Sequence, residues 1–73
     1  MSNASIIETI EPTRGKLLVA HSRAGDLLDH IYRGSVQTEG SEARRENDRK
    51  AVEDLREIAS RYGYDLVPSM GGN

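Results

Sequence analysis

The chain has 73 residues and no cysteine, phenylalanine or tryptophan, so it forms at most one small domain without disulfide bonds or thiolate metal sites. Its formal net charge of −2 differs from the basic balance of a dedicated nucleic-acid-binding module. No apolar run approaches the roughly 18 residues that span a bilayer, and the start lacks the pattern of a signal peptide. We therefore expect a cytoplasmic protein without a membrane segment.

The supply of core-forming residues is small. Only 36% of the residues are hydrophobic, and the three aromatic residues are all tyrosines. A core of this kind contributes about 3–5 kcal/mol net in a single small domain. Oligomerisation is the remaining common way to bury more apolar surface, so we expect a homo-oligomer.

The first expected element lies near the N-terminus. Residues Ser5 to Glu8 fit a capping box, which predicts a short helix from about Ile6 to Glu11 that Pro12 limits. The isoleucines of this stretch suit a strand as well. Residues 1–4 and 69–73 are predicted to be disordered.

The next segment, Lys16 to Arg33, is predicted to be a helix. Its apolar residues recur at spacings of three and four, as on one helix face. The alternative makes Lys16 to His21 a strand paired with Ser5–Glu11 and starts a helix at Asp26, which gives an α+β fold with an N-terminal β-hairpin. Gly25 favours this alternative slightly, whereas the unbroken apolar stripe favours one helix.

A second helix is expected from Ser41 to Tyr62, after a connection spanning Gly34 to Gly40. Ser41 is the predicted N-cap and Gly63 the C-terminal stop. Apolar residues at helical spacing occur only in its C-terminal half, from Ala51 onward. The stretch after Gly63, residues 64–67, is predicted to be extended and to pack back on the helices.

Two helices of similar length with a short link predict an all-α fold, an antiparallel helical hairpin in one domain of residues 1–73 that assembles into a helical-bundle oligomer. The apolar half of the second helix should then cover Leu17, Leu18 and Ala20. The other end of the first helix faces the polar half of the second, so its apolar side chains should bind a partner: Leu27, Leu28, Ile31 and Tyr32.

A basic cluster on the second helix is the next candidate site, made of Arg44, Arg45, Arg49 and Lys50. These side chains can contact an anionic ligand or the carboxylates of a partner. Equally, they can form ion pairs along their own helix with residues four positions away. The pairs expected in that case are Arg44–Asp48, Glu46–Lys50, Arg49–Glu53, Lys50–Asp54 and Glu57–Arg61.

The spacing of the two histidines predicts neither a metal site nor a catalytic site. Asp26 and His30 share a helix face, but two ligands are too few for a metal site, and His21 lies on the other side of the helix. We expect His30 to be a surface residue paired with Asp26. Neighbours such as His21 and Ser22 point to different sides of a helix, so they do not form a nucleophile and its base. The sequence predicts no enzyme, no metal and no cofactor.

The preferred interpretation is a non-catalytic binding or regulatory protein that contacts itself and a protein target. Small cysteine-free proteins of this type are frequent among bacterial and phage-encoded regulators and inhibitors. The alternative is an oligomer that sequesters an anionic small ligand such as a nucleotide, with arginine on phosphate and tyrosine on base. Nucleic acid is disfavoured as a partner because acidic residues alternate with the arginines and the lysine of the basic cluster and would repel the phosphates.

Overall fold

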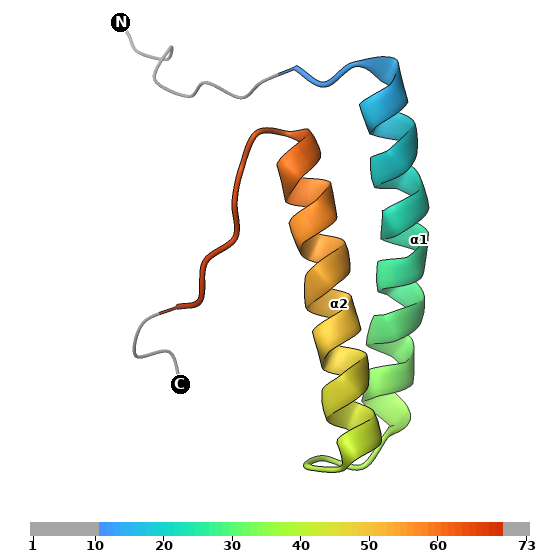
Figure 1. The fold of residues 1–73 in the computed structure, drawn as a ribbon. Coiled ribbons are helices and arrows are strands. Elements are labelled where there is room, and N and C mark those ends of the chain that lie inside the picture. Colours follow the sequence, from blue (N-terminus) through green and yellow to red (C-terminus); the bar gives the residue numbers. More distant parts are fainter. Residues whose placement is uncertain (1–10, 70–73) are drawn as a thin grey trace, which may run out of the picture.

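The computed structural model describes residues 11–69, which contain two antiparallel helices lying side by side (Figure 1). They are α1 (Arg14–Val36) and α2 (Glu42–Arg61). The prediction of an all-α helical hairpin is confirmed. The N-terminal element predicted from Ile6 onward lies outside the described residues up to residue 10, as do the ends 1–4 and 70–73, for which disorder was predicted.

Helix α1 begins at a cap and runs without interruption. The Thr13 hydroxyl oxygen accepts a hydrogen bond from the Lys16 backbone N–H at 3.3 Å, which satisfies one donor of the first turn. Residues 16–21 are helical, so the alternative with a strand in this stretch is wrong. The helix also continues past the predicted end at Arg33 to Val36, and Gly34 lies inside its last turn rather than in the link.

Helix α2 has the predicted limits. Ser41 is its N-cap, with the hydroxyl oxygen accepting from the Arg44 backbone N–H at 3.1 Å. At the other end Gly63 has φ of +86°, a backbone conformation that favours glycine. Its N–H donates to the carbonyl of Ser60 at 3.1 Å, and the N–H of Tyr64 donates to the carbonyl of Ala59 at 3.0 Å. This pair of bonds is a Schellman motif, which ends the helix and reverses the chain.

The reversed chain runs back along α2, on the side away from α1 (Figure 1). Its residues Leu66, Val67 and Pro68 line a cleft together with Val52, Leu55 and Arg56 of α2. The predicted return of this segment onto the hairpin is therefore observed, without a strand in the described range. The segment widens the apolar surface of α2 instead of filling space between the helices.

Little apolar surface is buried between α1 and α2. Ala20 is the single buried hydrophobic residue in the described range, and Asn47 and Asp54 are the buried polar ones. Of the three residues that α2 was expected to cover, Ala20 is buried, but Leu17 and Leu18 are 43% and 59% exposed, so the expectation is wrong for the two leucines. The positions that face α2 are spaced seven apart along α1, at Ala20, Leu27 and Gly34, and Leu17 and Leu18 are rotated away from that line.

The two interior glycines of α1 provide a matched test of this packing. A Cβ at Gly25 would meet no atom within 4 Å, so Gly25→Ala should raise the free energy of unfolding by about 0.5–1 kcal/mol through helix propensity. A Cβ at Gly34 would lie 3.3 Å from the side-chain nitrogen of Asn47. We expect Gly34→Ala to give a smaller gain or a loss in urea unfolding. An equal gain at both positions would contradict a close contact at Gly34.

Candidate functional site

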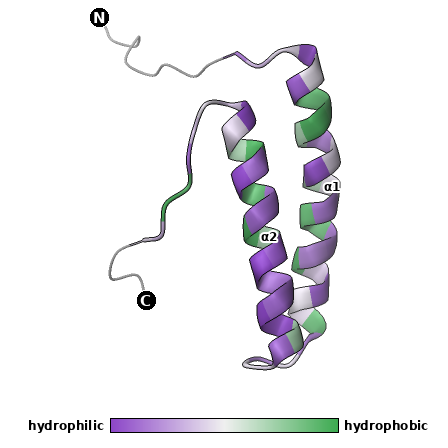
Figure 2. Cartoon of the chain, in the orientation of Figure 1, coloured by the Kyte–Doolittle hydropathy of each residue, from purple (hydrophilic) through white to green (hydrophobic). Residues whose placement is uncertain are grey.

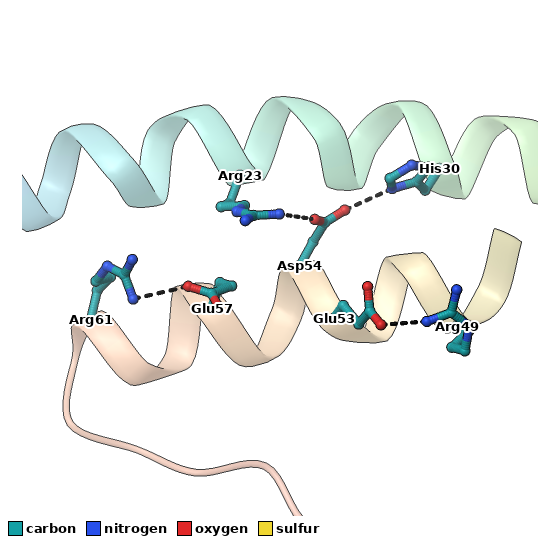
Figure 3. A network of polar contacts seen from close by, with 7 residues as sticks. All are labelled: Arg23, His30, Arg49, Glu53, Asp54, Glu57 and Arg61. Atoms are coloured by element: carbon teal, nitrogen blue, oxygen red, sulfur yellow. Dashed lines mark hydrogen bonds and ion pairs between the residues drawn. The ribbon is translucent and has the colours of Figure 1, made fainter. Parts of the chain in front are cut away.

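A buried carboxylate holds the two helices together. The side chain of Asp54, only 3% exposed, projects from α2 toward α1 and meets two partners there (Figure 3). One carboxylate oxygen lies 2.7 Å from Nδ1 of His30, and the other accepts a hydrogen bond from the Arg23 guanidinium at 3.3 Å. A buried charge requires partners of this kind, because an unpaired one is strongly destabilising.

A second buried polar residue fixes the register of the helices. Asn47, seven residues before Asp54, donates its side-chain N–H to the backbone carbonyl of His30 and lies against Gly34. Positions seven apart lie on the same side of a helix, so Asn47 and Asp54 form one polar line along α2. Sliding α2 by one turn would separate both residues from their partners, so this line specifies one alignment.

The position of His30 corrects the sequence-based expectation. The histidine pairs with Asp54 of the other helix instead of Asp26 of its own. The two residues are 24 positions apart in the chain, so helical spacing within α1 carried no signal of the contact. Within residues 11–69 no group of three or more His, Cys, Asp or Glu side chains is placed to hold a metal ion.

Large apolar side chains of both helices remain exposed. We call Leu17, Leu28 and Ile31 of α1 and Val52 and Leu55 of α2 the apolar face. Each is at least 43% exposed, and Leu28 reaches 69%. Of the partner-binding residues predicted from the sequence, Leu28, Ile31 and Tyr32 are exposed, whereas Leu27 is half-buried toward α2.

The residues of the apolar face lie on one side of the hairpin. On α1, Leu17 and Leu28 follow the positions that face α2 by about a quarter turn and Ile31 follows them by less. On α2, Leu55 follows the positions that face α1 by about a quarter turn in the same sense, and Val52 by more. Because the helices run antiparallel, the same sense of rotation brings both sets to the same side. The hairpin is therefore a single layer whose apolar residues share one side, which Asp48 also occupies because it lies seven positions before Leu55.

The other side of the layer is polar. On each helix, the positions on the side opposite to the apolar face carry charged side chains. They are Asp26, Arg33, Glu46, Lys50, Glu53 and Glu57. Colouring by hydropathy shows that α2 is almost entirely hydrophilic in its first half, next to the link (Figure 2). A layer with one polar and one apolar side resembles half of a two-layer domain.

Sequence reasoning found only part of the apolar face. It missed Leu17, Val52 and Leu55, which it assigned to the contact between the helices. The signal that could have identified them is the spacing of seven at Ala20, Leu27 and Gly34, where small residues allow close approach. Leu17, Val52 and Leu55 lie off that line and its counterpart on α2.

The basic cluster forms contacts mainly along its own helix. Of the five predicted pairs, Arg44–Asp48, Arg49–Glu53 and Glu57–Arg61 are confirmed, the last two visible in Figure 3. The pairs assigned to Lys50 are wrong, because Glu46 pairs with Arg49 and Asp54 with α1. Arg45 donates to the backbone carbonyl of Gly40 at 2.7 Å, which ties it to the link.

Arg49 sits between two carboxylates at the surface. Its guanidinium contacts Glu46 at 2.6 Å and Glu53 at 2.5 Å. The hydrogen bond from Arg49 lowers the pKa of Glu46 below its ordinary value, and the positive charges of Arg49 and then Lys50 add to the effect. The same contacts raise the pKa of Arg49. This cation is therefore already engaged by acidic groups of its own chain.

No family model matches the sequence, and no match to it was found among curated proteins or solved structures. Neither α1 nor α2, the helices of the described range, is long and apolar enough to cross a membrane.

Removing the buried carboxylate tests its structural role. Asp54→Ala leaves Arg23 and His30 without their acceptor and should lower the free energy of unfolding by about 1–3 kcal/mol in urea denaturation. Asp48→Ala is the matched control, because Asp48 is an exposed acceptor on the same helix and its pair is worth about 0.5 kcal/mol or less. Equal effects of the two substitutions would contradict a special role for Asp54.

The Glu46 carboxyl provides a test of the surface pairs. Its lowered pKa means that the contact stabilises the fold above the pKa of unfolded glutamate and that this contribution is lost as the pH falls through the lower folded value. We expect an NMR titration to show a Glu46 pKa below the ordinary range that moves up in Arg49→Gln and stays in place in Arg45→Gln. A Glu46 pKa that is unchanged in Arg49→Gln would contradict the assignment.

Proposed function

We propose that this chain is a non-catalytic binding protein that acts by presenting its apolar face to another protein surface. The observation that carries the proposal is the exposure of large apolar side chains from both helices on one side of the hairpin. Contiguous exposed apolar surface on a small protein marks an interaction site, whereas singly scattered residues do not. The charged opposite side keeps the assembly in water.

The shape of the face suits a helical partner. A cleft lies between α2 and the returning segment, where Val52 and Leu55 meet Leu66 and Val67, and Leu28 of α1 is exposed as well. An amphipathic helix fits such a groove with apolar residues at spacings of three and four. A protein of this kind regulates or inhibits its target by covering a surface that the target needs.

The contacts of the titratable groups support binding over catalysis. His30 and Asp54 form a histidine–carboxylate pair that joins the helices and stabilises the fold. Both belong to the polar seam, by which we mean the contact of Asn47 and Asp54 of α2 with Arg23, His30 and Gly34 of α1. Their chemistry is used in joining α1 to α2. Several charged side chains elsewhere form pairs along the helix surface, as Arg33 does with Asp29 at 2.9 Å.

Sequestration of an anionic ligand has weaker support. It needs guanidinium groups that converge on an open site, but Arg44 and Arg49 point at carboxylates of their own helix. A ligand phosphate would have to displace those carboxylates first. Lys50 lines a shallow hollow with Arg33, but Glu46 lies in the same hollow and opposes an anion.

The experiment compares immobilised wild-type chain with Leu28→Asp as bait in extracts of the source cells. We expect a recovered protein partner to be lost with Leu28→Asp, because a charge in the centre of the apolar face would be buried unpaired in the complex. Leu18→Asp is the matched control, since Leu18 is exposed on the same helix but points away from both α2 and the face. Circular dichroism verifies that both variants are helical.

In the same experiment, Arg45→Ala distinguishes a protein partner bound by the apolar face from an anionic ligand bound by the basic cluster. Under the proposal this substitution leaves the partner bound. Loss of binding with Arg45→Ala and retention with folded Leu28→Asp would overturn the apolar face as the contact surface.

A further inference from the structure

We infer that the protein partner offers a helical segment with a carboxylate beside its apolar side chains, and that this segment binds in the cleft between α2 and the returning segment, residues 64–68, with the carboxylate on Arg56. The inference rests on the proposed function, because it names the chemistry of the partner at one part of the same surface. Two observations carry it: the lining of the cleft and the unpaired guanidinium of Arg56 within that lining.

The first observation concerns the walls of the cleft, which lies on the side of α2 away from α1 (Figure 1). Val52 and Leu55 of α2 form one wall, and Leu66, Val67 and Pro68 form the other. The volume of the cleft is about 380 Å³, within the roughly 300–1,000 Å³ of ligand sites in proteins. Sites of this kind combine apolar walls with a small number of polar groups that orient the ligand.

The second observation concerns Arg56, which supplies the polar group of this cleft. Its guanidinium has no ion pair or hydrogen bond with any residue that the structure describes. The neighbouring acidic residues of α2 are already engaged, Glu53 by Arg49 at 2.5 Å and Glu57 by Arg61 at 3.0 Å. Because arginine carries five N–H donors, Arg56 is able to bind a carboxylate that another molecule supplies.

The other arginines of α2 differ from Arg56 in this respect. Three of them contact carboxylates of their own helix: Arg44, Arg49 and Arg61. Arg45 donates to a backbone carbonyl of the link. Arg56 therefore keeps its donors available, and it is also the arginine that lines the apolar cleft. A cation beside apolar walls attracts a carboxylate more strongly than one surrounded by water, because the walls lower the local dielectric constant.

The spacing along α2 sets the spacing of the groups on the partner. Val52 and Arg56 are four positions apart, so about 6 Å of helix rise separates the apolar wall from the guanidinium. Residues four apart on a partner helix lie on one side of it and span the same distance. A leucine followed four positions later by a glutamate therefore places methyl groups in the cleft and a carboxylate at Arg56. Such a complex leaves no charge unpaired at the contact.

The acidic residues on this side of the molecule lie outside the cleft. Asp65 precedes Leu66 in the returning segment but is not a lining residue. Asp48, which shares a side of α2 with Leu55, contacts Arg44 at 3.3 Å. Arg56 is thus the one charged side chain that lines the cleft within the described residues, and its sign selects a ligand with negative charge.

The first experiment titrates the methyl-labelled full chain with two peptides and follows its NMR spectrum. Both probes are alanine-rich helical peptides with two leucines one turn apart and, one turn further on, either glutamate or glutamine. We expect the glutamate peptide to shift the methyl signals of Leu55, Leu66 and Val67. It should bind about threefold to tenfold more tightly than the glutamine peptide, because a charge-assisted hydrogen bond adds to the apolar contact. The absence of shifts at these methyl groups would overturn the inference.

The second experiment repeats the titration with variants. In Arg56→Gln the two peptides should bind equally, whereas Arg45→Gln, the matched control, should keep the preference of the wild-type chain for glutamate. Leu66→Ser should weaken the binding of both peptides, and its helicity should be unchanged because Leu66 lies outside the helices. A preference for glutamate that survives in Arg56→Gln would overturn the assignment of the carboxylate to this arginine.

The bait experiment of the proposed function separates the two proposals. A recovered protein that is lost with folded Leu28→Asp but retained with Arg56→Gln and Leu66→Ser would leave the apolar face as the binding surface and overturn the inference about the cleft. A recovered protein that all three folded variants retain would overturn both proposals.

Discussion

The pairing of Asp54 with Arg23 and His30 is the interaction on which the rest of the hairpin depends. A carboxylate that is 3% exposed is tolerated only because α1 supplies a guanidinium and an imidazole at the correct positions. Those two residues are seven apart on α1, so one side chain of α2 contacts two positions that lie about two turns apart on the partner helix. The contact therefore defines orientation and register as well as proximity.

Because polar residues occupy the contact between the helices, large apolar side chains are left exposed elsewhere on the hairpin. When the positions between two helices are occupied by Asp54, Asn47, Gly34 and Ala20, the large apolar residues must lie elsewhere. Here Leu17, Leu28 and Leu55 lie about a quarter turn away from the facing positions of their helices, on one side of the layer. The helices thus meet through polar and small residues and leave large apolar side chains of both helices exposed.

The ends of the helices follow from local chemistry, which made them predictable. Ser41 caps α2 because a hydroxyl near the first turn accepts an orphan N–H, and Gly63 ends it because the left-handed backbone there excludes most side chains. Gly34 was misread as the start of the link for a related reason. A glycine near a helix end often marks a stop, but here it allows the side chain of Asn47 to approach α1.

The sequence by itself determined that the described chain forms two helices of these lengths, joined as an antiparallel hairpin, because periodicity and caps act over a few residues. It also indicated that Leu28, Ile31 and Tyr32 would be left uncovered by a polar partner helix. Only the tertiary structure decided which sides of the helices meet. Hydrophobic spacing favours leucines at the contact between the helices. The contact is instead made largely by small and polar residues, because Asp54 and Asn47 find their hydrogen-bond partners on α1. Contacts between residues 24 or 31 positions apart leave no local pattern, so His30–Asp54 and Arg23–Asp54 could not be predicted from spacing.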